Sequence, residues 1–285
     1  MLQVEPGQEP RFGRIPGGQH NRNDGAISLY YQGTRRMEPS FKNKLIQNNL
    51  LIGTIITLPA PEIAEIFCSA GFDWLFVDLE HSAMSIKDVQ VILQAAAPQA
   101  PCVIRVPSND DVWIKKALDI GAAGIIVPNV RTTEEAERAV QRCKYPPEGV
   151  RSVGIARAQS YGDKLHEYLS SANDDLAVII QIEHIDAVDN IHNLIKIPGI
   201  DSLFIGPYDL AASMGKMGQT TDTEVQNAIA RVKQCAQQAN LPLGIFGPTT
   251  EAVRPYIQGG YTLIAVGIDT LFLGNAGKTI TASLK

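Results

Sequence analysis

The sequence has no long hydrophobic run, no cluster of basic residues and no closely paired cysteines, and each absence excludes a class of protein. No apolar run approaches the roughly 20 residues that cross a bilayer, and the amino terminus lacks a charged start followed by an apolar core, so we expect no membrane partner. The net charge is −5 without a basic segment, which argues against nucleic acid. The four cysteines, Cys68, Cys102, Cys143 and Cys235, lie far apart, which is typical of free thiols in a reducing cytoplasm.

The first forty residues differ in texture from the rest of the chain. Residues 1–39 are rich in Gly, Pro, Asn, Gln and Arg without an apolar period, which predicts an amino-terminal extension or arm, with disorder as the alternative. Residues 40–285 are long enough for one barrel-sized domain, and 45% of the whole chain is hydrophobic, enough for a large core.

From residue 40 onward, short apolar runs alternate with longer helical patterns, which is typical of repeated βα units. The runs predict strands at 51–56, 74–78, 102–106, 124–127, 177–183, 202–205, 243–246 and 263–266. Helices are predicted at 41–47, 61–70, 86–97, 112–120, 133–143, 187–196, 224–238 and 251–258, with a last one from 269. Eight strands close a (β/α)8 TIM barrel, an α/β fold. The connection at 144–175 is unusually long and is interpreted as a lid or interface element.

Polar side chains follow several predicted strands at their carboxyl ends, where barrel enzymes keep their chemistry. The set comprises Asp78, Glu80 and His81 after the second strand, Arg105 on the third, Gln181 and Glu183 on the fifth, and Tyr208 and Asp209 after the sixth. Alternation places Gln181 and Glu183 on one face of their strand. We therefore expect these side chains to meet at one rim.

Two carboxylates at successive strand ends, Glu183 and Asp209, are suited to share one small cation. A hard divalent ion such as Mg²⁺ takes one or two protein carboxylates and completes its shell with water or substrate. Such a cation could bind the carboxylate and keto oxygens of an α-keto acid and stabilise the adjacent enolate. The alternative is that both acids are ordinary polar residues that cap helices.

The remaining rim residues suit the same chemistry. Arg105 offers a fixed positive charge to a carboxylate or developing oxyanion, and His81 is a candidate proton carrier with Asp78 as the partner that orients its ring. Taken singly, His81 is as well explained by a structural hydrogen bond and Arg105 by a salt bridge. None of the predicted strands contains lysine, which argues against Schiff-base chemistry inside the barrel and leaves the metal-dependent route.

Several ordered motifs between residues 40 and 273 resemble those of one enzyme family. They are Gly71-Phe72-Asp73-Trp74, Asp78-Leu79-Glu80-His81, Ala117-Leu118-Asp119-Ile120-Gly121, Tyr145-Pro146-Pro147-Glu148-Gly149, Gln181-Ile182-Glu183 and Ile205-Gly206-Pro207-Tyr208-Asp209-Leu210. With these motifs the chain resembles the HpcH/HpaI aldolases, metal-dependent (class II) pyruvate aldolases that cleave 4-hydroxy-2-oxo acids. The resemblance implies a lyase that releases pyruvate and an aldehyde, and a homo-oligomer that is hexameric or trimer-based.

The resemblance also implies a role for each rim residue. Glu183 and Asp209 are expected to bind Mg²⁺ or Mn²⁺, with Co²⁺ as a further candidate, and Glu80 to order a water on the metal. Arg105 and the backbone around Tyr208 and Asp209 are expected to hold pyruvate, Gln181 to line the site, and His81 with Asp78 to transfer protons.

The chain departs from the family pattern on the aldehyde side of the predicted pocket. Tyr208 and Phe246 stand where smaller residues are usual, so both are expected to reshape the pocket, and the aldehyde stays open. Two alternatives remain: an oxaloacetate decarboxylase or macrophomate-synthase-like condensing enzyme, and a non-catalytic barrel that senses a metal or ligand.

Overall fold

The computed structural model describes residues 39–97 and 99–285. The predicted extension at 1–39, apart from residue 39, lies outside these residues, and the division of the chain at residue 40 stays a prediction. Residues 39–285 form one compact unit. Within the described residues, no helix combines the length and the apolar character needed to cross a membrane.

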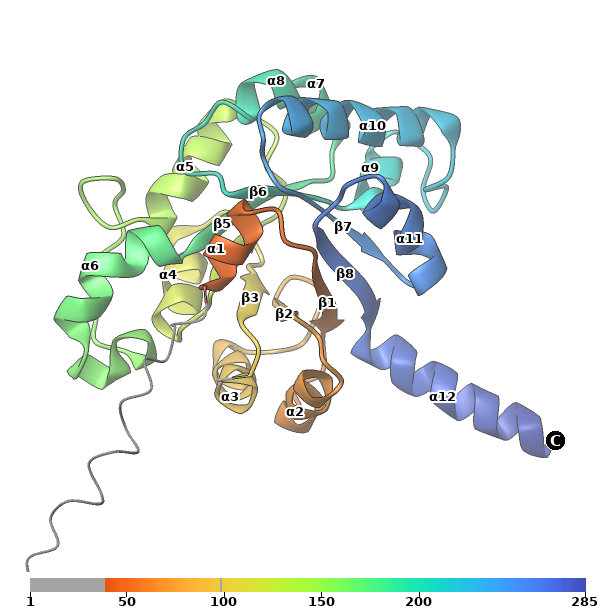
Figure 1. Ribbon diagram of the computed structural model, residues 1–285, viewed down its shortest axis with the longest axis horizontal. Helices are drawn as coiled ribbons and strands as arrows, with labels where there is room; N and C mark the ends of the chain where they lie inside the picture. The colour runs from red at the N-terminus through yellow and green to blue at the C-terminus, as the bar shows by residue number, and fades with distance from the viewer. Residues whose placement is uncertain (1–38, 98) are drawn as a thin grey trace, which may run out of the picture. The chain divides into compact units, whose positions relative to one another are not determined.

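Eight parallel strands close into a barrel in the order β1 to β8, and helices surround it (Figure 1). The strands are β1 Leu51–Ile56, β2 Trp74–Asp78, β3 Cys102–Arg105, β4 Gly124–Val127, β5 Ala177–Ile182, β6 Ser202–Ile205, β7 Leu243–Gly247 and β8 Leu263–Ile268. The register of β8 on β1 shifts between Gly53 and Ile55, where the barrel closes. The predicted (β/α)8 fold and its eight strands are confirmed, with strand ends moved by up to two residues.

The helices begin largely where the sequence predicts. They are α1 Phe41–Ile46, α2 Pro61–Ser69, α3 Ile86–Ala96, α4 Asp111–Asp119, α5 Thr133–Cys143, α6 Leu165–Asp175, α7 Ile185–Asp189, α8 Ile191–Leu194, α9 Pro207–Ser213, α10 Thr223–Gln238, α11 Thr250–Gln258 and α12 Asp269–Leu284, with a 3₁₀ segment η1 at Arg157–Gly162. Side-chain caps fix several starts: Ser85 and Thr132 form capping boxes at α3 and α5.

The sequence-based helix assignment was wrong in three places. The helix predicted at 187–196 divides into α7 and α8, and α9 was missed. The connection at 144–175 is not a plain loop, because it contains η1 and α6. Its conformation is anchored by Arg151, a buried residue whose guanidinium stacks over Tyr145, 4.5 Å from the ring centre, and pairs with Asp119 at 2.7 Å.

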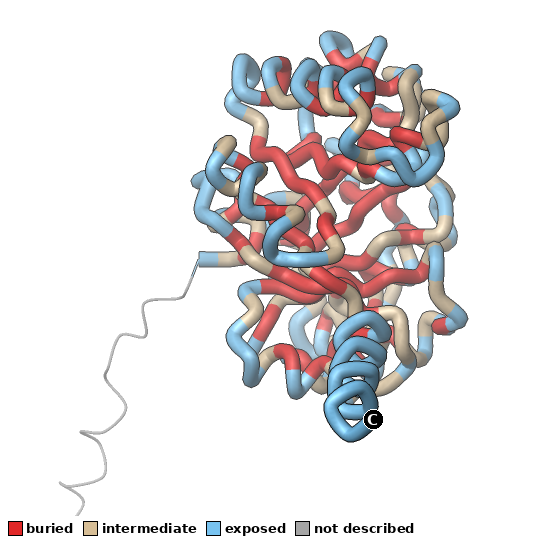
Figure 2. The backbone as a smooth tube through the Cα atoms, turned by 90° about the vertical axis from the view of Figure 1, so that its right-hand side faces the viewer, coloured by how far each residue is buried: buried red, intermediate tan, exposed pale blue. Residues whose placement is uncertain are grey.

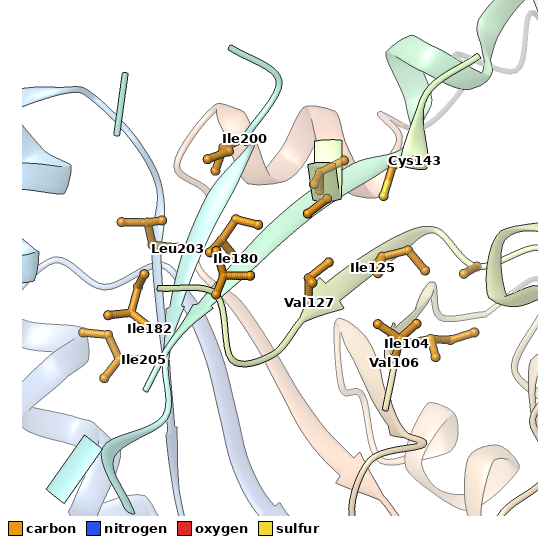
Figure 3. Packing of buried hydrophobic residues seen from close by; sticks show 14 of the residues in the cluster. Ile104, Val106, Ile125, Val127, Cys143, Ile180, Ile182, Ile200, Leu203 and Ile205 are labelled. Carbon is orange, nitrogen blue, oxygen red and sulfur yellow. The ribbon is translucent and has the colours of Figure 1, made fainter. Parts of the chain in front are cut away.

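Alternation along the strands divides the core into two layers. One set of side chains packs between the strands and the surrounding helices; Figure 3 shows part of it, including Ile104, Val127, Ile180 and Ile205. The other set fills the barrel interior, where the rings of Trp74, Phe76 and Phe204 pack against one another. Gly53 makes room for this filling, because a Cβ there would lie 2.5 Å from Trp74 Nε1.

The amino-terminal end of the barrel is closed by α1. Phe41 packs against Trp74 with ring centres 6.0 Å apart, and Leu45 is fully buried. Lys42 fixes the helix from the side, with its Nζ 3.0 Å from Asp201 Oδ1. This end of the interior is therefore filled mainly with hydrophobic side chains, whereas the charged residues Asp78, Arg105 and Asp209 line the cavity at the carboxyl ends of the strands.

The last helix, α12, is the least covered element. Every residue from Thr270 to Lys285 is exposed, although Leu271, Phe272, Leu273, Ile280 and Leu284 are apolar, and the helix extends away from the barrel (Figures 1 and 2). Phe272 makes an edge contact with Phe67 of α2, with ring centres 5.8 Å apart. A single helix of this length is marginally stable in water without packing, so α12 presents an apolar surface that calls for cover.

Candidate active site at the carboxyl end of the barrel

The inward-facing positions of the strands end at one cavity of about 450 Å³. It is lined by Ile55, Thr57, Phe76, Asp78, His81, Arg105, Gln181, Phe204, Gly206, Pro207, Tyr208, Asp209, Phe246, Ile268 and Thr270. The structure thus brings together Asp78, His81, Arg105, Gln181, Tyr208, Asp209 and Phe246 as the sequence predicts. Glu183 lies against this site through Gln181 and Gly206.

Arg105 links the ends of β2 and β3. Its Nε and Nη2 donate to the two carboxylate oxygens of Asp78, at 2.9 and 2.6 Å, in a two-pronged ion pair. Its Nε also lies 3.2 Å from Glu80 Oε2. Both Asp78 and Arg105 are largely removed from solvent, so each is strongly oriented by the other.

The sequence predicts that Asp78 orients the imidazole ring of His81, but the hydrogen bonds of its carboxylate go to other groups. Its Oδ1 accepts the backbone N–H groups of Glu80 at 3.0 Å and His81 at 3.4 Å, which fixes the turn after β2 rather than the ring. The His81 side chain is 64% exposed, and its Nε2 lies 3.8 Å from Glu80 Oε2. The turn therefore presents the ring at the cavity mouth with freedom to move, and the Asp78–His81 proton-transfer pair stays a prediction.

Glu183 is buried at the end of β5, and hydrogen bonds fix both of its carboxylate oxygens. Asn129 donates its backbone N–H to Oε1 at 2.6 Å, and the amide of Gln181 donates to Oε2. Asn129 holds this position with a φ of 55°, in the left-handed region that asparagine tolerates. Sequence reasoning missed Asn129 because its contact is made by the backbone, although an Asn directly after a strand is a turn signal.

Gly206 lets Glu183 approach the end of β6. A Cβ at Gly206 would lie 3.1 Å from Glu183 Cβ and 3.2 Å from Glu183 Oε2, so a larger residue would push the carboxylate away. Asp209, in the first turn of α9, is exposed and faces the same cavity. Two carboxylates thus reach one rim from β5 and from α9.

The site carries an excess of negative charge. Burial raises the pKa of Glu80 to about 7, with Arg105 opposing the shift and Glu183, Asp78 and Asp209 adding to it. Burial also raises the pKa of Glu183, and the charge of Asp209 contributes in the same direction. Arg105 is the cation that opposes both shifts. Such a cluster gains stability from an added positive charge.

The side-chain atoms that could bind an added cation at this site are oxygens. The side-chain oxygen of Gln181 is buried without a hydrogen-bond partner, beside the Glu183 carboxylate. Among the described residues, no cluster of three or more His, Cys, Asp or Glu side chains is placed to hold a metal ion. Two carboxylates and an amide oxygen, completed by water and substrate, would give a hard divalent cation the oxygen ligands that it prefers.

Comparison with known proteins identifies the family. Residues 52–276 match the model of the HpcH/HpaI aldolase/citrate lyase family. The chain belongs to this family. The expectation of a carbon–carbon lyase built on a (β/α)8 barrel is thereby confirmed.

Three similar proteins agree with this membership. A 4-hydroxy-2-oxo-heptane-1,7-dioate aldolase of Shigella sonnei is 38% identical over 248 residues, which cover 86% of this chain and 95% of that protein. A 4-hydroxy-2-oxovalerate aldolase of Rhodococcus jostii is 38% identical over 245 residues, 85% of this chain and 95% of that one. A crystal structure of an HpcH/HpaI aldolase/citrate lyase family protein from Burkholderia cenocepacia matches with a TM-score of 0.82 and 36% identity, covering 85% of this chain and 98% of that one.

Proposed function

We propose that this protein reversibly cleaves a 4-hydroxy-2-oxo acid to pyruvate and an aldehyde, with a divalent cation bound by Glu183 and Asp209. The proposal rests on one observation: Asp78 and Asp209 line one cavity with Arg105 and with Gln181, whose side-chain oxygen is buried and unpartnered, and Glu183 lies against this cavity through Gln181. The two curated aldolases act, by their names, on 4-hydroxy-2-oxo acids, and they supply the substrate class. Mg²⁺ and Mn²⁺ are the proposed cations because the ligand atoms are hard oxygens.

In the proposed reaction the bond between C3 and C4 of the substrate breaks. The bonding electron pair moves onto C3 and gives the enolate of pyruvate, while the C4 hydroxyl loses its proton and becomes the aldehyde. When bound, the cation supplies Lewis-acid stabilisation of this enolate. A proton then added to C3 completes pyruvate, so the protons balance.

Arg105 is assigned to the pyruvate half of the substrate, and His81 to the C4 hydroxyl of the aldehyde half. Arg105, oriented by Asp78 and Glu80, directs its remaining N–H donors at the substrate carboxylate and at the oxygen where charge develops. The exposed ring of His81 takes the proton from the C4 hydroxyl at the cavity mouth. Glu183, fixed by the backbone of Asn129, and Asp209, in the lining of the cavity, are the two carboxylates assigned to the cation.

The direct test is pyruvate release from 4-hydroxy-2-oxo acids of several chain lengths and from oxaloacetate, first with a chelator and then with added Mg²⁺ or Mn²⁺. We expect cleavage of the hydroxy-oxo acids that the chelator abolishes and the metal restores. Glu183→Gln keeps the shape of the side chain but removes its charge, and it should lose the response to metal. Turnover of oxaloacetate alone favours a decarboxylase, and cleavage that ignores the chelator contradicts the proposed cation.

We also propose that the protein is a homo-oligomer, with α12 packed against a second copy. The support is the row of exposed apolar side chains along α12, which the barrel of the same chain leaves uncovered beyond Phe272. Light scattering on the intact protein is expected to give a multiple of the chain mass. A monomer that keeps α12 fully helical would contradict this assembly.

A further inference from the structure

A buried carboxylate outside the charged cluster joins the two strands at which the barrel closes. Asp269, the first residue of α12, is 1% exposed. Its Oδ2 accepts the backbone N–H groups of Thr57 and Leu58, both at 2.8 Å. Its Oδ1 accepts the Thr57 hydroxyl and the Thr270 N–H, both at 2.7 Å. Four donors thus satisfy this carboxylate and fix the residues that follow β1.

The hydrogen bond that the Thr57 hydroxyl donates to Asp269 determines whether this hydroxyl can act as a donor or an acceptor in the cavity. A hydroxyl has one hydrogen to donate and two lone pairs that accept. Since the hydrogen of Thr57 is directed to Asp269 Oδ1, which as a carboxylate oxygen only accepts, the oxygen of Thr57 is left with acceptor capacity. Thr57 continues the inward-facing alternation of Leu51, Gly53 and Ile55, and it lines the cavity. The cavity therefore meets a fixed hydrogen-bond acceptor at this point.

The surroundings of Thr57 are otherwise mostly apolar. Ile55, Phe246 and Ile268 line the same side of the cavity, on β1, β7 and β8. Going around the closed barrel, these strands lie across from β3 to β5, which carry Arg105 and lead to Glu183. The carboxylate and keto group of the substrate belong at the charged side. Carbon atoms beyond C4, which leave as the aldehyde, therefore extend toward Thr57.

The geometry points to Thr57 as a residue that selects the aldehyde: its oxygen accepts a hydrogen bond from a hydroxyl group on the aldehyde chain. The preferred aldehyde is then a short hydroxyaldehyde rather than an unsubstituted alkyl aldehyde of equal length. The short chain follows from Tyr208 and Phe246, whose rings lie 6.3 Å apart at the same cavity. This inference rests on the proposed aldolase reaction and assigns the substrate class of that site.

The test is condensation of pyruvate with pairs of aldehydes matched in carbon number, in the presence of Mg²⁺. Glycolaldehyde is compared with acetaldehyde, and lactaldehyde with propionaldehyde, as ratios of kcat/KM. Thr57→Val replaces the hydroxyl by a methyl group of similar size and is expected to lower the ratio about two- to tenfold, the value of one neutral hydrogen bond. Thr57→Ser keeps the hydroxyl and should keep most of the preference.

Thr54→Val is the matched control on the same strand. Its hydroxyl donates to the carbonyl of Gly267 at 3.3 Å and is fully buried away from the cavity lining, so the ratio should stay at the wild-type value. Thr57→Ala serves as a second variant if Thr57→Val does not fold, and circular dichroism checks each protein.

The possible failures are distinguishable. A wild-type protein that condenses all four aldehydes without preferring the hydroxylated ones overturns the role of Thr57 alone. The same holds if Thr57→Val and Thr57→Ala keep the wild-type ratio. If the wild-type protein condenses none of the aldehydes with pyruvate, the proposed reaction fails, and the inference fails with it.

Discussion

The two sides of the cavity are built in different ways. On the side of β2 to β6, Arg105 forms ion pairs with Asp78 and Glu80, and Asn129 and Gln181 donate hydrogen bonds to Glu183. This side carries an excess of negative charge. On the side of β7, β8 and β1 the lining is mainly apolar, and the buried Asp269 fixes the position of Thr57 from behind. In the proposed reaction the first side supplies the charges for the chemical step, and we expect the second to decide which aldehyde fits. This difference in construction predicts that substitutions on one side change the reaction and substitutions on the other change the aldehyde preference.

Arg105→Ala is expected to have the largest effect, because it removes the positive charge from the charged side. Turnover should fall by about 10²- to 10³-fold, as when a preorganised donor is deleted. The change also leaves the carboxylate of Asp78, 2% exposed, without its ion-pair partner, so the free energy of unfolding should fall by roughly 3–5 kcal/mol. Kinetics and urea unfolding measure the two losses.

Arg105→Lys tests whether the positive charge of Arg105 or its two-pronged ion pair with Asp78 causes these losses. It keeps the charge but cannot form the two-pronged pair, so its stability should recover more than its turnover. Equal turnover in Arg105→Ala and the wild-type protein would show that Arg105 is only structural. The absence of turnover in both proteins would favour the ligand-sensing alternative.

Phe246→Ala should act on the apolar side alone. It opens the wall where Phe246 meets Tyr208, so kcat/KM for long-chain aldehydes should rise about tenfold relative to short ones. Turnover with short aldehydes should change less, since Phe246 lies on β7 in the apolar part of the lining, whereas Arg105 lies on β3. A matched series of aldehydes tests this, and a uniform loss across the series would contradict the separation of the two sides.

Glu80→Gln is expected to give the smallest change. It should alter the number of protons that the protein releases when the cation binds. The pKa of Glu80 stands at about 7, so near that pH about half of the molecules carry a proton on it. An added cation lowers this pKa and releases the proton, so cation affinity should rise as the pH increases through about 7. Calorimetry of Mg²⁺ binding in buffers of different ionisation enthalpy should show about half a proton less released by Glu80→Gln. Equal proton release would mean that another group couples to the cation.

The fold was predictable from the sequence because its signals are local. The alternation that turns Gln181 and Glu183 to one face and the capping box at Thr132 each depend on residues close in the chain, and the structure agrees with both. The assignment was wrong where tertiary contacts decide. The connection at 144–175 is anchored by the guanidinium of Arg151, which lies over the rings of Tyr145 and Tyr168. No local sequence pattern predicts these ring contacts.

The candidate site divides in the same way. The sequence by itself determined which residue types stand at the strand ends, since strand period and strand order bring Asp78, Arg105, Glu183 and Asp209 to one rim. Only the tertiary structure decided how they pair: Asp78 with Arg105 rather than with the ring of His81, and Glu183 with the backbone of Asn129. The bond between Thr57 and Asp269 likewise spans 212 positions. Period and order depend on neighbouring residues, whereas the partner of a buried charge depends on which distant groups the closed barrel places within hydrogen-bonding distance.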